Sequence, residues 1–253
     1  FTGSTSVGVK LLEQAAANVL KTSMELGGNA PFLVLPSADV DRAVEGALVA
    51  KMRNIGQACT AANRMIVHSS LAEEFTAKLA ARVGAMRVGD GMAPGTEVGP
   101  LVSSSALDDV EAMVREAVAD GARVVVGGSR VEGPGHFMQP TVLADVAPSS
   151  RCFREEIFGP VAPIVTEDSV NEAVALANDT DFGLMSYVFA EDLTEALTTA
   201  ERLESGMVGL NSGLVSDPAA PFGGVKSSGL GREGGPEGIE EFLEIKYIGM
   251  SLG

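Results

Sequence analysis

Apolar residues along the chain fall into two kinds of pattern, short continuous runs and stretches with a helical period. Residues 31–35 form the apolar run PFLVL, which is typical of a short buried strand. Shortly after it, from Val40 to Leu48, apolar residues recur at i, i+3, i+4, i+7 and i+8. This spacing places them on one face of a helix, so the pattern predicts a strand followed by an amphipathic helix.

Two further helices are predicted from capping-box pairs at their amino ends. Ser70 and Glu73 form the first pair and predict a helix that runs to about residue 85. Ser169 and Glu172 form the second pair, before a helix that ends near residue 178. In such a pair the serine hydroxyl accepts a hydrogen bond from a backbone N–H of the first turn, which favours helix initiation at that point.

The same alternation extends over the rest of the chain, and no internal repeat is visible. Strands that alternate with helices indicate an α/β fold with a mostly parallel sheet flanked by helices. The loop predicted at 216–238 is long, and a loop of that length inside a compact domain is more often functional than not. The pattern predicts helices near residues 7–20, 106–119 and 192–204, strands at 64–68, 123–127, 186–190, 207–211 and 244–250, and loops at 127–136 and 216–238.

Composition narrows the class of protein. The 253 residues are 45% hydrophobic without a run of eighteen apolar residues, which is typical of a globular chain with a full core and no transmembrane helix. The net charge of −16 disfavours nucleic acid and anionic membranes as partners. The two cysteines, Cys59 and Cys152, cannot form a disulfide framework, so we expect a reducing, cytoplasmic location. The two histidines argue against a His-rich zinc site.

Cys59 and Glu25 are the leading catalytic candidates. Cys59 lies in GQACTAANR, where small and polar neighbours form no apolar period and backbone N–H groups are positioned to stabilise a thiolate or an oxyanion. Glu25 lies in MELGGNAP, between apolar residues and glycines, and a desolvated carboxylate of this kind suits a general base. The alternatives are a small buried cysteine and a surface glutamate.

Three other segments carry candidate binding residues. Gly3 and Ser4 lie at a predicted strand-to-helix turn, where a helix amino end attracts anions, although an ordinary turn explains them equally well. Glu156 and Phe158 in EEIFGP combine a carboxylate for ribose hydroxyls with a ring for a planar cofactor, the alternative being a surface Glu beside a core Phe. Arg53 is six residues before the cysteine and suits a carboxylate ligand, unless it is a surface side chain.

Five motifs together carry a resemblance to a known family. They are MELGGNAP, GQACTAANR, EEIFGP, NDTDFGL and PFGGVKSSGLGRE, in this order and at these separations. The chain resembles the C-terminal, catalytic half of an aldehyde dehydrogenase over essentially its whole length. Its motifs MRNIGQAC and LEIKYIGM are most similar to the succinate-semialdehyde dehydrogenase branch.

This resemblance implies a role for each matching position. The roles concern catalysis, NAD or NADP binding and substrate binding. Cys59 matches the nucleophile and Glu25 the general base; Gly3 and Ser4 match the pyrophosphate turn; Leu26, Gly27, Glu156 and Phe158 match residues around the nicotinamide and its ribose; Arg53, Ser216 and Phe222 match the substrate pocket.

The resemblance also implies a domain division. Residues 1–27 match the tail of a dinucleotide-binding domain, 28–227 a catalytic domain, and 228–253 a returning helix and an oligomerisation strand. A homo-oligomer, dimer or tetramer, is therefore expected, since an unpaired edge strand is a liability. We expect a further portion before Phe1, because the family's N-terminal half, with most of its cofactor site, is not in the sequence. Ala61 stands where many semialdehyde enzymes have a second cysteine, which excludes that disulfide switch.

The expected function is NAD(P)-dependent oxidation of a small aldehyde, with succinate semialdehyde as the leading substrate. The thiol forms a thiohemiacetal and then a thioester, which water activated by Glu25 hydrolyses. Three alternatives stay open: a dehydrogenase for another semialdehyde such as glutarate semialdehyde, a non-catalytic fragment without the cofactor domain, and a cysteine hydrolase or esterase. The sequence does not distinguish NAD from NADP.

Overall fold

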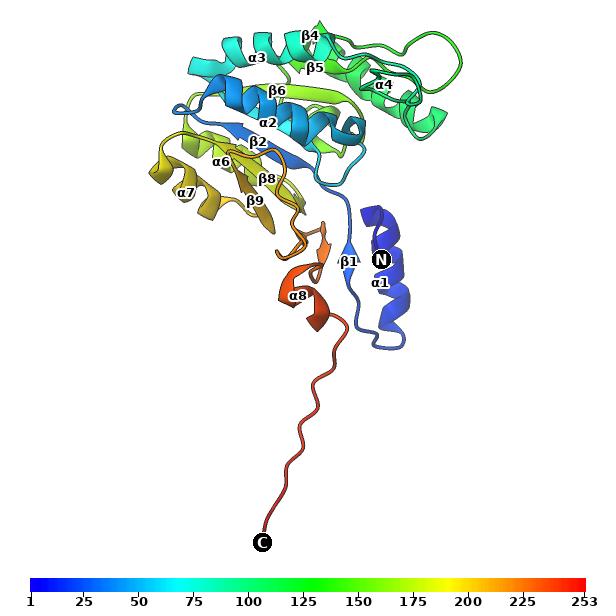
Figure 1. Cartoon of the computed structure of the whole chain (residues 1–253), viewed down its shortest axis with the longest axis vertical. Coiled ribbons are helices and arrows are strands. Elements are labelled where there is room, and N and C mark those ends of the chain that lie inside the picture. Colours follow the sequence, from blue (N-terminus) through cyan, green and yellow to red (C-terminus); the bar gives the residue numbers. More distant parts are fainter.

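A seven-stranded, mostly parallel sheet forms the body of the molecule in a computed structural model that describes residues 1–253. Helices cover both of its faces, and short strands lie outside it (Figure 1). The sheet strands are β2 (Ala30–Val34), β3 (Ala62–His68), β4 (Arg123–Val126), β5 (Thr141–Ala144), β6 (Val161–Glu167), β8 (Met185–Phe189) and β9 (Met207–Leu210). The short strands are β1 (Met24–Glu25), β7 (Phe182–Gly183), β10 (Val225–Lys226) and β11 (Gly229–Leu230). The helices are α1 (Thr5–Ala16), α2 (Val40–Met52), α3 (Ser69–Gly84), α4 (Ser104–Ala119), α5 (Arg151–Arg154), α6 (Val170–Asn178), α7 (Leu193–Arg202) and α8 (Gly235–Glu240).

The strand order of the sheet is β4-β5-β6-β3-β2-β8-β9, and only the β4–β5 pair is antiparallel. Alternate residues of each central strand point to opposite faces, so one strand contributes to two cores. Phe32 and Val34 join the core under α2 and α3, whereas Leu33 joins the core under α4, α6 and α7. The α/β class and the mostly parallel sheet predicted from the sequence are confirmed.

Two central strands, β5 and β6, are absent from the sequence prediction. Pro163 lies inside β6, opposite Leu143 of β5, and a proline within an apolar run argues against a strand because it cannot donate to the ladder. Strand β5 is only four residues long and fully buried, so it shows no alternation. Tertiary pairing outweighs both local signals.

The predicted capping boxes differ in outcome. Ser169 is the N-cap of α6, and its hydroxyl accepts from the Glu172 N–H, as predicted. The prediction at Ser70 is wrong: helix α3 begins at Ser69, and the ring of His68 accepts from the Ser70 N–H instead. A histidine N-cap carries no common sequence signal.

The predicted final strand at 244–250 is also not a strand in the single chain. Its residues extend away from the body beyond α8, and no neighbouring strand lies beside them (Figure 1). A strand needs a hydrogen-bonded partner, so this segment stays an exposed tail here, with Ile245 and Tyr247 almost wholly accessible. Pairing with another subunit stays a prediction, as does the division into domains.

Candidate active site

The amino ends of three neighbouring strands build the candidate site. Strands β2 and β3 are parallel, and their register places Ala30 opposite Ala62. The segments that precede them, 25–29 and 56–61, therefore meet at one edge of the sheet. A Cβ on Gly28 would lie 2.1 Å from the Cys59 carbonyl oxygen, so only glycine permits this contact. Strand β6 lies beside β3 and brings its own preceding segment, 155–160, to the same edge.

A strained turn holds the nucleophile segment in place. Between α2 and Cys59, the backbone of Asn54 and Ile55 adopts left-handed conformations, with φ of 51° and 52°. Such a conformation is costly for a β-branched residue and persists only where packing enforces it. Gly56 follows with φ of 77°, and a Cβ there would lie 2.2 Å from the Gly159 oxygen. The turn thus packs directly against the segment that contains Phe158.

The thiol of Cys59 is half-buried, and its pKa is raised. Burial is the main cause, and the carboxylates of Glu156 and Glu25 add to it. The backbone N–H groups of Cys59 and Thr60 reach the sulfur and oppose this rise. The predicted backbone stabilisation of a thiolate is therefore present, but burial and the two acids outweigh it, so the thiol is the favoured resting form.

Glu25 is buried at 3% exposure, and neither of its carboxylate oxygens has a hydrogen-bond partner. Its pKa is raised to about 7, chiefly by burial and also by the charge of the nearby Glu233, while Arg232 acts in the opposite direction. Its backbone is held by Phe1 on one side and by the β1–β11 pairing on the other. A carboxyl group with a pKa near neutrality suits proton transfer at physiological pH.

Glu156 links the base segment to the third strand of the site. Its Oε1 accepts from the Gly28 N–H at 3.0 Å, and burial raises its pKa. Lys51 is buried at 1% exposure, donates to Asn63 Oδ1 at 2.8 Å, and its positive charge opposes that rise. Burial lowers the pKa of Lys51 itself to about 7. Sequence reasoning missed Lys51, because a lysine at the end of a helix usually lies at the surface.

A cavity of about 420 Å³ lies beside the thiol. It brings together all six residues predicted to bind the cofactor, and the thiol itself also lines it. Phe158 is 41% exposed and has a φ of 50°, a strained conformation that presents its ring at the cavity. The cavity is lined by Thr2, Gly3, Ser4, Leu26, Gly27, Gln57, Ala58, Cys59, Glu156 and Phe158.

The cavity fits a nucleotide cofactor in two respects. Ser4 is the N-cap of α1 without a side-chain capping bond, so the first-turn N–H groups of this helix are not used by a side-chain cap and suit a phosphate. A Cβ on Gly27 would lie 2.8 Å from Glu156 Oε2, so the backbone there approaches the carboxylate as closely as only glycine allows. The residues present match an anionic group, ribose hydroxyls and a planar ring.

The three predicted substrate residues are not all joined. Arg53 is exposed at the end of α2, and its Nη2 lies 3.5 Å from Thr60 Oγ1. Phe222 is half-buried and pairs with Glu233 through two backbone hydrogen bonds, next to Gly223 at the Glu25 carboxylate. Ser216 is exposed on its loop, and its side chain makes no hydrogen bond to Arg53 or to any other residue. Arg53 and Ser216 form no hydrogen bond with each other, and their predicted role in binding the distal carboxylate of the substrate stays a prediction.

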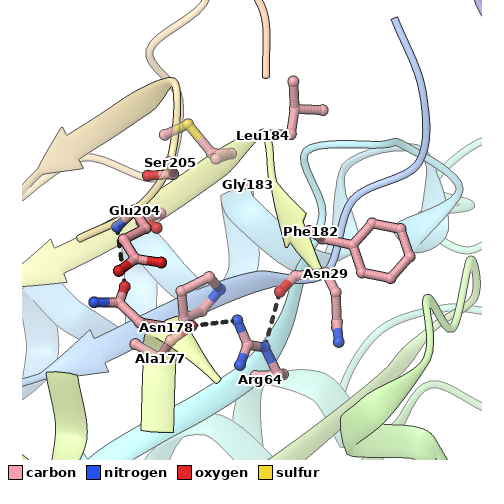
Figure 2. Close-up of a pocket in the computed structure, with 12 residues that line it drawn as sticks. Asn29, Arg64, Ala177, Asn178, Phe182, Gly183, Leu184, Glu204 and Ser205 are labelled. Atoms are coloured by element: carbon pink, nitrogen blue, oxygen red, sulfur yellow. Dashed lines mark hydrogen bonds between the residues drawn. The ribbon is translucent and has the colours of Figure 1, made fainter. Parts of the chain in front are cut away.

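A buried arginine ties the base segment to the body. Arg64 donates to the carbonyl oxygens of Asn29 and Ala177, each at 2.8 Å (Figure 2). It also donates to the carbonyl oxygen of Leu176 at 3.0 Å. The last two carbonyls belong to the carboxyl end of α6, where a cation is favourable. The cavity in Figure 2 is only about 10 Å³, too small for a substrate. This arginine has a structural role, and no sequence pattern distinguishes it from a surface arginine.

The structure also has no helix that is both long and apolar enough to cross a lipid bilayer.

Two relatives named for their activity align with this chain over nearly its whole length. A succinate-semialdehyde dehydrogenase of Paenarthrobacter nicotinovorans is 55% identical over 99% of the chain and 56% of the relative. A glutarate-semialdehyde dehydrogenase of Pseudomonas putida is 48% identical over the whole chain and 52% of the relative. The chain thus spans about half the length of the curated relatives it matches.

Solved structures and the family pattern agree with these relatives. The NAD+ complex of an aldehyde dehydrogenase from Bacillus cereus superposes with a TM-score of 0.97 at 35% identity, over 100% of this chain and 52% of that one. The model of the aldehyde dehydrogenase family matches residues 1–248. With nearly its whole length matched, the chain belongs to the aldehyde dehydrogenase family.

Proposed function

We propose that the full-length protein oxidises succinate semialdehyde to succinate with NAD or NADP as cofactor. The observation that carries this proposal is the packing of the Cys59 segment against Gly28, which leaves the thiol within reach of the charge of Glu25 and beside a cavity suited to a nucleotide. The relatives support the same activity, since they include succinate- and glutarate-semialdehyde dehydrogenases.

In the proposed mechanism the Cys59 sulfur, as thiolate, forms a bond to the aldehyde carbon. The carbonyl oxygen becomes an oxyanion, and the backbone N–H groups of Cys59 and Thr60, which reach the sulfur, are its proposed hydrogen-bond donors. A nicotinamide cofactor, when bound, supplies the hydride acceptor that this oxidation requires.

Hydrolysis of the resulting thioester falls to Glu25. Its buried carboxylate, with a pKa of about 7, accepts a proton from water, and the water oxygen attacks the thioester carbon. The C–S bond breaks, the acid leaves, and the thiol is restored. Gly3 and Ser4 would hold the cofactor's phosphates, Glu156 its ribose hydroxyls, and Leu26, Gly27 and Phe158 the nicotinamide.

The choice of substrate rests on Arg53. Its guanidinium is exposed and forms none of the ion pairs that engage the arginines at 42, 82, 115, 123, 130, 151 and 154. In a chain of net charge −16, a cation without an acidic partner is available to a carboxylate ligand. Ser216 and Phe222 are proposed to line the same substrate pocket.

Glutarate semialdehyde is the second candidate, because the relative from Pseudomonas putida carries that name. It is one methylene longer, and a pocket distinguishes a methylene by only about 1–3 kcal/mol. A homo-oligomer and a cytoplasmic location belong to the same proposal. If the protein is instead a fragment that binds no cofactor, titration with NAD or NADP should show no binding. If it is a cysteine esterase, it should hydrolyse an ester in the absence of NAD and NADP.

Replacement of Arg53 by alanine tests the substrate assignment in the full-length protein. We expect KM for succinate semialdehyde to rise about 10- to 100-fold, because a charge-assisted hydrogen bond is lost, while KM for butanal stays within twofold. Arg202→Ala, at another exposed arginine without an ion pair, is the matched control and should leave both values unchanged. Cys59→Ala should abolish turnover of both aldehydes. Equal changes in KM for the two aldehydes would contradict the carboxylate-binding role of Arg53.

A further inference from the structure

Thr60 directly follows the nucleophile, and its hydroxyl has no part in the mechanism above. The residue is buried at 7% exposure. Its Oγ1 accepts one hydrogen bond, from Nη2 of Arg53 at 3.5 Å, and donates to no acceptor in the chain. A buried hydroxyl usually makes both kinds of bond. Thr60 therefore has a hydrogen left for a group that the guanidinium also reaches.

The position of this hydroxyl is fixed from the core. Tyr187 Oη donates to the Thr60 carbonyl oxygen at 2.8 Å, and its ring packs against Phe32 with centroids 5.8 Å apart. Burial raises the pKa of Tyr187 to about 12, and the charges of both Arg53 and Cys59 act on it. Tyr187 thus lies near both the thiol and the guanidinium, and its hydrogen bond ties the backbone of Thr60 to strand β8.

The guanidinium of Arg53, by contrast, has no other anchor. Its contact with Thr60 is its only side-chain hydrogen bond, and no acidic residue pairs with it. An exposed arginine without a contact samples many rotamers, and binding then costs the entropy of fixing it. One hydrogen bond to a buried hydroxyl restricts this freedom before a ligand arrives.

We propose that Thr60 is a positioning residue that sets the preference for aldehydes with a distal carboxylate. Its hydroxyl oxygen orients the Arg53 guanidinium, and its hydrogen is a second donor for the carboxylate held there. This inference rests on the proposed function, in which Arg53 binds the charged end of the substrate. It assigns a specificity role to the side chain next to the nucleophile, beside the catalytic role of the nucleophile itself.

Thr60→Val tests this role, because valine keeps the shape of threonine and removes only the hydroxyl. In the full-length protein we expect kcat/KM for succinate semialdehyde to fall about three- to tenfold, chiefly through KM. The value for butanal, which has the same number of carbons and no carboxylate, should stay within twofold. Thr60→Ser keeps the hydroxyl and should restore the wild-type ratio between the two substrates. If Thr60→Val does not fold, Thr60→Ala provides the same comparison.

A double-mutant cycle with Arg53→Ala separates positioning from a general structural effect. In the Arg53→Ala background, Thr60→Val should change the succinate semialdehyde to butanal ratio by less than twofold, because no guanidinium is left to orient. An undiminished effect in that background, or an equal loss for both aldehydes in the single variant, would overturn the role of Thr60. A wild-type protein that does not prefer succinate semialdehyde to butanal would instead overturn the proposed substrate, and this inference with it.

Discussion

The sheet body and the amino-terminal segment of residues 1–26 are built in different ways. All five residues of β2 are buried, whereas α1 buries only Gly8 and leaves Val7 and Val9 exposed. In Figure 1, α1 and β1 lie apart from the sheet and its covering helices. The body is a complete core on both faces, and the amino-terminal segment buries little apart from residues 24–26 at its junction with the body.

This contrast places the site at the boundary between the two regions. Cys59 is anchored in the body, and Glu25 lies at the junction, where the amino-terminal segment becomes buried. A nucleophile needs precise support, which a rigid sheet edge provides. The cavity beside it is lined by Gly3 and Ser4, which precede α1, and by Cys59 and Glu156 of the body. The proposed reaction thus depends on how firmly the amino-terminal segment is held to the sheet body.

The largest expected effect separates the two regions by stability. Phe32→Ala should lower the free energy of unfolding by about 3–5 kcal/mol, because the ring is fully buried and stacks on Phe189 at 4.8 Å. Val9→Ala in α1, at 47% exposure, should change it by less than about 0.5 kcal/mol. Urea unfolding of both variants measures the difference. Similar losses in the two would show that α1 is part of the core.

A smaller effect is expected at the junction, and it depends on pH. Burial raises the pKa of Glu25 from 4.5 to about 7, so the folded chain keeps a proton that the unfolded chain releases between these values. The stability from this protonated form is full below pH 4.5 and is lost as pH rises through about 7. The loss amounts to about 2–3 kcal/mol, and Glu25→Gln should not show it.

Urea unfolding gives the free energy of unfolding of Glu25→Gln and of the wild type at pH 4.5 and at pH 7.5. The effect is the amount by which the difference between the two proteins changes from one pH to the other. Glu13→Gln, at an exposed site in α1, is the control and should show no such change. A stability difference for Glu25→Gln that is the same at both pH values would show that the carboxyl group is not desolvated.

The smallest effect is expected from the carboxyl-terminal tail. Removal of residues 244–253 should change the free energy of unfolding of the single chain by less than about 0.5 kcal/mol, since these residues are exposed and form no strand. If the full-length protein is a homo-oligomer, as proposed, and the tail pairs between its subunits, analytical ultracentrifugation of the truncated protein should show dissociation. An unchanged oligomer would contradict that pairing.

Local sequence patterns predicted most of the helices and strands, but not two strands of the main sheet. The helical face from Val40 to Leu48 is buried as predicted, because its period depends only on the sequence. Strand β6 was not predicted, because Pro163 argues against a strand. It forms because it pairs with β3 on one side and β5 on the other. The histidine N-cap of α3 and the unpaired tail beyond α8 were missed for the same reason: each depends on which group is nearby in space.

The fold class, the family and the identity of the candidate catalytic pair could be predicted from the chain alone, because they follow from periodicity and from long motifs at fixed separations. The electrostatics of the site could not, because they depend on which groups come close in three dimensions. Glu25 and Glu233 are far apart in the sequence, and Arg53 and Thr60 are seven residues apart. Neither spacing indicates that the two side chains lie close together in space. Desolvation and close contact act through space, so the raised pKa of Glu25 and the anchoring of Arg53 by Thr60 emerge only when the strands are paired.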